Sequence, residues 1–112
     1  MSTLTTLSVR RLRTRREQLA RQLPDVELTL QGTLQTQGRR CGKPGCHCAA
    51  GELHGPYVYL AVRSGRRTRL LYIAAELAEE VARRVEVTSR LEGILEEISA
   101  INLELLARGE LS

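Results

Sequence analysis

The sequence predicts an α+β fold, in which a basic N-terminal helix, a small antiparallel sheet and a long C-terminal helix follow one another. Three observations predict it. Apolar residues near both ends of the chain recur at spacings of three and four, which is the period of one helix face. In the middle they alternate with polar residues, which is the period of a strand. A segment rich in glycine, cysteine and histidine interrupts that alternation.

The first expected element is a helix over residues 8–23. Ser8 can cap its N-terminus, and Pro24-Asp25 ends it. One apolar stripe with an arginine in its middle runs along it, formed by Val9, Leu12, Arg16, Leu19 and Leu23. Most of the other arginines lie off that stripe, so the rest of this helix is basic.

Three strands are expected in the middle of the chain. Residues 26–37 alternate between apolar and polar, which predicts a strand with one buried face. Residues 57–63 and 66–73 predict two further strands that pair as a hairpin around a turn at Ser64-Gly65. The sequence does not define the register of this hairpin, so the positions of its arginines and tyrosines relative to one another stay open.

The last expected element is a helix over residues 75–108, either continuous or broken near Thr88-Ser89. Its second half carries an apolar seam with coiled-coil spacing, formed by Val87, Leu91, Ile94, Ile98, Ile101 and Leu105. Further leucines widen this face, which favours more than one packing neighbour. We expect a homodimer, although the seam can also pack within the chain. The three segments 8–23, 26–73 and 75–108 are expected to form one small domain over residues 1–112.

Composition sets the class of protein and its charge pattern. The chain has 112 residues, no Phe, no Trp and three Tyr, so an aliphatic core is expected. Residues 1–73 carry 13 basic against 4 acidic residues and residues 74–112 carry 4 against 9, so that +9 and −5 give the net charge of +4. No apolar run approaches the ~18 residues that cross a bilayer, and the N-terminus lacks a signal core. We expect a cytoplasmic protein without membrane contact.

Four residues of the central loop have the spacing Cys-x4-Cys-x-Cys-x5-His. Thiolate and imidazole are the ligands that zinc takes in tetrahedral sites, and the glycines and prolines between them allow tight turns. We therefore expect a structural zinc site made by Cys41, Cys46, Cys48 and His54. Two alternatives stay open: His47 as the fourth ligand, and a loop whose thiols are simply free.

An enzyme is not expected. A catalytic zinc keeps one position for water and has a general base nearby, whereas Glu52 is the only acidic residue in the loop. Catalysis would require that His54 is not a ligand. No Ser/His/Asp set, phosphate-binding glycine loop or small-molecule site is apparent.

The stretch from Arg40 to Leu60 resembles a family of small uncharacterised prokaryotic proteins with the pattern R-C-G-K-P-x-C-x-C-A-x-G-x-x-H-G-P-Y-x-Y-L. The resemblance extends from about residue 30 to the C-terminus and leaves out the basic helix. It implies a strand at residues 68–73 followed by a Glu-rich helix, and it implies no activity. Two positions depart from the family: His47 replaces a basic residue, and Ala74 replaces a proline.

Two function classes follow from these observations. The first is a small zinc-binding accessory or regulatory protein that binds DNA or RNA, because arginines and tyrosines surround the metal loop and the hairpin. Its candidate nucleic-acid-binding residues are Arg39, Arg40, Lys43, Tyr57, Tyr59, Arg63, Arg66, Arg67 and Arg69. The second is a dimeric protein–protein adaptor, in which the basic helix pairs with the acidic one and no nucleic acid binds.

Overall fold

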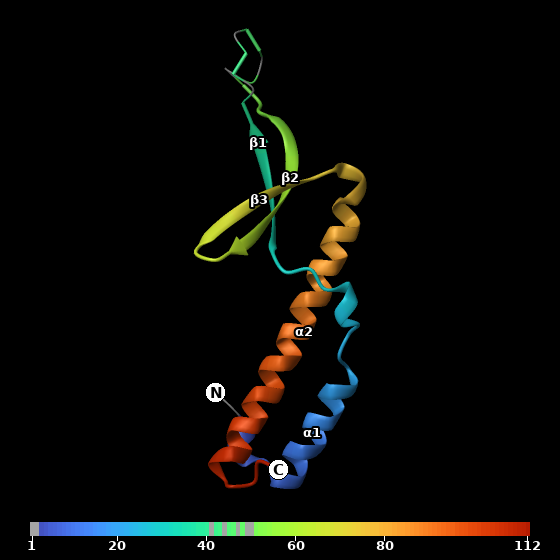
Figure 1. The fold of residues 1–112 in the computed structure, drawn as a ribbon, viewed down its shortest axis with the longest axis vertical. Coiled ribbons are helices and arrows are strands. Elements are labelled where there is room, and N and C mark those ends of the chain that lie inside the picture. Colours follow the sequence, from blue (N-terminus) through green and yellow to red (C-terminus); the bar gives the residue numbers. More distant parts are fainter. Residues whose placement is uncertain (1–2, 41, 44, 47, 49–50) are drawn as a thin grey trace. The chain divides into compact units, whose positions relative to one another are not determined.

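The computed structural model describes residues 3–40, 42–43, 45–46, 48 and 51–112 (Figure 1). Its main elements, in chain order, are α1 (Val9–Arg21), β1 (Thr33–Arg39), β2 (His54–Ser64), β3 (Arg67–Ile73) and α2 (Ala75–Ala107). The α+β prediction is therefore confirmed. The chain divides into two compact units, Met1–Thr29 with Val87–Ser112 and Leu30–Glu86, and the expectation of a single domain stays a prediction.

Helix α1 begins where the sequence predicts. The side chain of Ser8 caps it by accepting a hydrogen bond from the Arg11 amide at 3.2 Å, which satisfies one of the free N–H groups of the first turn. The helix ends at Arg21, shortly before Pro24. Leu12 and Leu19 of the predicted stripe are fully buried.

The helical unit has its core between α1 and the second half of α2. The buried residues of this core are Leu12, Leu19, Ile94, Ile101 and Leu105. The predicted seam from residue 94 onward therefore packs against α1 of the same chain. Helix α2 is continuous through Thr88. No helix among the described residues has an apolar stretch long enough to cross a membrane.

Polar contacts reinforce the packing of the basic helix on the acidic one. Arg15 forms an ion pair with Glu97 at 3.4 Å, and Arg13 forms one with Glu110 at 3.3 Å. Arg16, the charge within the apolar stripe of α1, donates to the Asn102 side chain at 2.7 Å. Several arginines of α1 thus have partners inside this unit.

The C-terminus of α2 ends in a glycine turn. Gly109 has a φ of +72°. Its amide bonds to the carbonyl of Leu106 at 3.0 Å, and the Glu110 amide bonds to the carbonyl of Leu105 at 2.8 Å. This pattern is a Schellman motif, which satisfies carbonyls that the last helical turn leaves free.

The three strands form one antiparallel sheet in the order β1-β2-β3. The β2–β3 hairpin is confirmed, with its two-residue turn at Gly65-Arg66, one position later than expected. Gly65 adopts a φ of +63°, which this kind of turn requires and which glycine adopts without strain. Tyr59 lies opposite Tyr72 in the resulting register.

The first strand is shorter than the sequence predicts. Residues 26–28 form a 3-10 helix, and β1 begins only at Thr33, so the prediction of a strand from residue 26 is wrong. The amides of Leu28 and Thr29 bond to carbonyls three residues earlier. Val26 is 67% exposed. No buried face exists there, so the alternation of apolar and polar residues has no sheet to pack against.

Candidate metal centre and basic pocket

The candidate metal centre lies in the loop between β1 and β2. Arg39 at the end of β1 is paired with His54, the first residue of β2, after a register shift between Gln37 and Arg39. This pairing brings the imidazole of His54 to the base of the loop that carries Cys46 and Cys48. The hydrogen-bonded sheet therefore positions one ligand, and the loop carries the other two.

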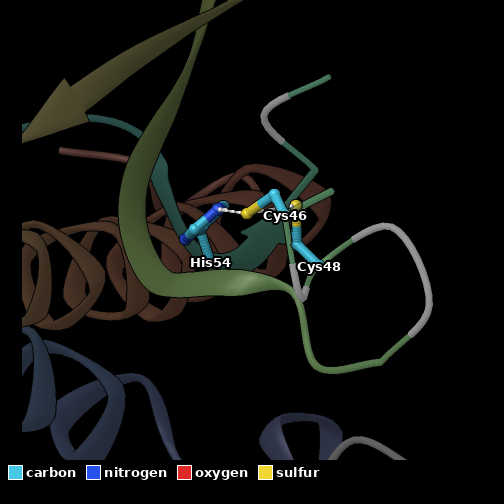
Figure 2. A group of neighbouring side chains, drawn as sticks. All are labelled: Cys46, Cys48 and His54. Atoms are coloured by element: carbon cyan, nitrogen blue, oxygen red, sulfur yellow. Dashed lines mark hydrogen bonds between the residues drawn. The ribbon is translucent and has the colours of Figure 1, made fainter. Parts of the chain in front are cut away.

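Three side chains, those of Cys46 and Cys48 from this loop and that of His54 from β2, point toward one another (Figure 2). The Sγ atom of Cys46 lies 3.2 Å from Nε2 of His54 and 3.5 Å from Sγ of Cys48, and all three ligand atoms lie within 4.8 Å of one another. With zinc bonds of ~2.3 Å to sulfur and ~2.0 Å to nitrogen, a tetrahedral site separates two sulfurs by about 3.8 Å and sulfur from nitrogen by about 3.5 Å. The two distances from Cys46 are each about 0.3 Å shorter than these values, and the cluster could hold a metal ion.

Two hydrogen bonds hold the loop around these ligands, one from an arginine side chain and one within the backbone. Cys48 is 1% exposed, and its carbonyl accepts a hydrogen bond from the guanidinium of Arg40. The Cys46 amide donates to the carbonyl of Lys43 at 3.2 Å. Such outer contacts orient the ligands of real metal sites, and the contact of Arg40 with Cys48 is of this kind.

The structure brings together three of the four predicted ligands. Cys46, Cys48 and His54 form the cluster, whereas Cys41 lies outside the described residues. The alternative ligand His47 also lies outside them. The choice of His54 for this group is therefore supported by geometry, and the role of Cys41 stays a prediction.

A basic pocket adjoins the cluster. It has a volume of about 460 Å³ and is lined by Arg39, Arg40, Lys43, Cys46, His54 and Tyr57. Three cationic side chains therefore share one concave surface with two of the candidate metal ligands. Such a surface suits an anion, since a guanidinium and an ammonium both bind phosphate or carboxylate oxygens.

The sheet separates the other residues that the sequence grouped as one nucleic-acid surface. Side chains two apart on a strand share a face, so Tyr57, Tyr59 and Arg63 lie on one face of β2. The register places Arg69 opposite Val62 and Arg67 opposite Ser64, which puts both arginines on the other face. A single flat surface cannot therefore use all nine residues.

Distance along the sheet divides the set again. Arg66 lies in the hairpin turn at the end of β2, whereas the metal loop precedes the start of β2. At ~3.3 Å per residue, the eleven residues of β2 separate the two by roughly 30 Å. The basic residues of the loop and those of the hairpin turn are two separate clusters.

One predicted stacking residue is buried, and an exposed one was missed. Tyr59 is 7% exposed, and the guanidinium of Arg39 lies 4.8 Å above its ring centroid. Tyr72 of β3 is 59% exposed and lies on the same face. A two-residue hairpin turn was the signal that could have found it, because such a turn fixes which residues of β2 and β3 share a face.

The fold and the site define a small α+β protein with a Cys-Cys-His cluster that could hold a metal ion. A family described as "Domain of unknown function (DUF6788)" matches residues 9–83. The chain belongs to this family. The match includes α1, which the resemblance seen in the sequence left out, and it ends within α2. Comparisons with curated proteins and with solved structures give no match.

Proposed function

We propose that the protein is a small zinc-binding accessory or regulatory protein that binds nucleic acid, and that its metal has a structural role rather than a catalytic one. The observation that carries this proposal is the basic pocket, in which Arg39, Arg40 and Lys43 adjoin the Cys46 and His54 side chains. A metal there would fix the loop, and the fixed loop would hold three cations at one place. That arrangement suits a phosphate group of a nucleic acid backbone.

The metal is proposed to be zinc with Cys41 as the fourth ligand. Two thiols and an imidazole favour zinc over the oxygen-binding metals, and a fourth protein ligand would close the site to water. Protein purified without chelator should then contain one zinc per chain, and the double variant Cys46→Ser with Cys48→Ser should contain none. X-ray absorption should give a shell of three sulfurs and one nitrogen. A shell with a water oxygen would contradict the structural role.

The distribution of ion pairs supports nucleic acid as the partner. Every ion pair found among the described residues involves an arginine of α1, an arginine of α2 or Arg108 just after it. Seven basic residues and one acidic residue, Glu52, lie between positions 30 and 73. In the described part of that segment, no basic side chain is neutralised by an acidic one. The positive charge of the sheet and its loop is therefore left for an external anion.

A salt titration tests the phosphate contacts. Binding of a short oligonucleotide should weaken steeply with salt, and the variant Arg39→Gln with Lys43→Gln should lower the slope of log K against log salt by about 1 to 2. The matched control is Arg10→Gln with Arg11→Gln, which removes the same charge from α1. An equal loss of slope in both variants would mean that only net charge matters, and a flat response of the wild type would exclude the proposal.

The adaptor remains the second candidate function, since the structure supplies one observation in its favour. The ion pair Arg15–Glu97 joins the basic helix to the acidic one, and Arg13–Glu110 joins it to the residues just after α2, which is the pairing that this hypothesis requires. In the second half of α2, three leucines are exposed, namely Leu95, Leu103 and Leu106. We propose a second copy of the chain as the partner on this face. A homodimer that binds no oligonucleotide would favour the adaptor.

A further inference from the structure

All three aromatic side chains of the protein gather on one face of the sheet. The ring of Tyr72 lies edge-on to that of Tyr59, with centroids 5.9 Å apart, and edge-on to that of Tyr57, with centroids 6.2 Å apart. The chain has no Phe and no Trp. We call the side of the sheet that carries these rings the tyrosine face. Tyr72, at 59% exposed, is its most accessible ring, and Tyr57 is half-buried.

The tyrosine face is cationic and has no acidic residue. Arg39 covers the ring of Tyr59, and Arg63 shares the face with Tyr59 by its alternation along β2. The strands β1, β2 and β3 contain no Asp and no Glu. Tyr57 belongs both to this face and to the basic pocket. The pocket and the aromatic rings therefore form one continuous surface.

The opposite face differs in chemistry. It carries aliphatic side chains at the central positions, namely Leu60, which is buried, and Leu71, which is exposed, and the two arginines near the hairpin turn, Arg67 and Arg69. No aromatic side chain lies there, because Tyr57, Tyr59 and Tyr72 all project to the tyrosine face. Phosphate contacts are possible on both faces, but base stacking is possible only on one.

This difference discriminates between forms of nucleic acid. The bases of a duplex are stacked on one another and present only their edges in the grooves. Unpaired bases present their flat faces, and aromatic side chains next to a basic groove bind them by stacking without requiring a sequence. An exposed ring beside a pocket for a phosphate is therefore suited to a single strand.

We infer that the protein binds single-stranded nucleic acid, with bases stacked on Tyr72 and Tyr57 and a backbone phosphate in the basic pocket. This inference rests on the proposed function and adds to it the class of ligand and the face that binds it. The stacked bases follow β2, and Arg63 provides a second phosphate contact toward the hairpin turn.

Fluorescence anisotropy with labelled single-stranded and double-stranded oligonucleotides of about ten nucleotides, DNA and RNA, tests the inference. The wild-type protein should bind at least one single strand more tightly than the duplex of the same sequence. Tyr72→Ala should weaken that binding by roughly 5- to 100-fold, which is the range for loss of one stacked base. Tyr72→Phe keeps the ring and should bind as the wild type does.

The matched control is Leu71→Ala, the neighbouring position on the opposite face of β3, which should leave binding within about twofold. Because every fluorescent ring of the protein lies on the tyrosine face, intrinsic tyrosine emission is a second readout. An unlabelled single strand should quench it, whereas polyphosphate, which has charge but no bases, should not. This readout does not depend on any variant folding correctly.

The outcomes separate the inference from the proposed function. If duplex and single strand bind equally and Tyr72→Ala behaves as Leu71→Ala does, the stacking inference is wrong while nucleic-acid binding stands. Tighter binding of the duplex overturns the inference in the same way. If no oligonucleotide binds at low salt, the proposed function fails and the inference fails with it.

Discussion

Gly55 occupies a backbone position that no other residue can take without strain. Its φ is +111°, and a Cβ atom there would lie 2.8 Å from the amide nitrogen of Tyr57 and 3.2 Å from the carbonyl oxygen of Gln37. Both are backbone atoms of the sheet, which cannot move aside at low cost. Gly55 lies in β2 between His54 and the tyrosine face, which begins two residues later at Tyr57, so its conformation affects where the imidazole lies.

The variant Gly55→Ala should therefore displace His54 and weaken metal binding. We expect a loss of affinity of about 10- to 100-fold, as for other changes that disturb the orientation of a ligand, measured by competition with a chromogenic chelator. Gly93→Ala in α2 is the control, because a Cβ there meets nothing within 4 Å. That variant should keep its metal affinity and gain about 0.5–1 kcal/mol of stability. Unchanged affinity in Gly55→Ala would mean that the histidine is not a ligand.

Arg108 ties the first residues of the chain to the end of α2. Its guanidinium donates to the carbonyls of Leu7 at 2.7 Å, Leu4 at 3.0 Å and Thr5 at 3.2 Å, and it also pairs with Glu104 at 2.9 Å. This one side chain donates to three carbonyls of that segment, of which the Leu4 carbonyl also accepts from the Leu7 amide at 3.2 Å. Leu4 and Leu7 thereby stay packed against the core of the helical unit.

Arg108→Ala should lower the free energy of unfolding by about 1–3 kcal/mol, because it removes three hydrogen bonds from a charged donor, two of which are partly buried. Urea denaturation followed by circular dichroism measures this. Arg83→Ala is the comparison, since Arg83 only pairs with Glu80 and its side chain is 65% exposed; surface pairs of this kind contribute about 0–1 kcal/mol. Equal effects in the two variants would show that the three carbonyl contacts add nothing.

At the level of the elements, the sequence predicted the helix ends and the hairpin turn, because capping residues, proline and glycine determine these locally. Ser8 and Pro24 mark the ends of α1, and Gly65 marks the hairpin turn to within one residue. The same reasoning failed at Val26 because an alternating pattern predicts a strand only where a neighbouring strand exists to cover one face. The continuity of α2 through Thr88 was left open for a related reason: tertiary burial of that side chain outweighs its weak helix propensity.

The sequence predicted the Cys-Cys-His cluster but not which aromatic side chains beside it are accessible. The spacing predicted Cys46, Cys48 and His54 together with Cys41, and left His47 open as an alternative to His54, since ligands so close in sequence need no long-range information to meet. The accessibility of Tyr59 and Tyr72 depends on cross-strand neighbours, above all on Arg39 covering one ring. Such contacts follow from register, and register requires the pairing of β1 with β2 across a loop of fourteen residues, positions 40–53.

Across the whole molecule, the basic residues of α1 and those of residues 30–73 differ in whether acidic side chains neutralise them. Part of the positive charge of α1 is neutralised by Glu97 of α2 and by Glu110, which follows α2. Residues 30–73 are also basic, and their three strands contain no Asp or Glu that could neutralise this charge. The net charge of +4 therefore understates the basic character of the sheet and its loop. We expect this segment, rather than α1, to dominate the attraction of the protein for polyanions.

The exposed leucines of α2 allow a test of whether the protein forms a dimer. Leu95, Leu103 and Leu106 are 52%, 63% and 56% exposed, and at 3.6 residues per turn they lie within about 80° on α2. Ile94, by contrast, is buried against the core that α1 shares. A charge at Ile94 would therefore disrupt the helical unit itself, whereas charges at the exposed leucines would act on a dimer alone.

We expect light scattering to give the wild-type protein twice the mass of one chain. Leu103→Glu with Leu106→Glu should give the monomer mass with unchanged helicity, because the charges would have to be desolvated in an apolar interface. Val26→Glu with Leu77→Glu is the matched control, since it adds the same charge at residues that are 67% and 55% exposed, and it should stay dimeric. A wild-type monomer would mean that these leucines simply face solvent. A dimer that survives the first pair and dissociates with the second would move the interface away from residues 95–106.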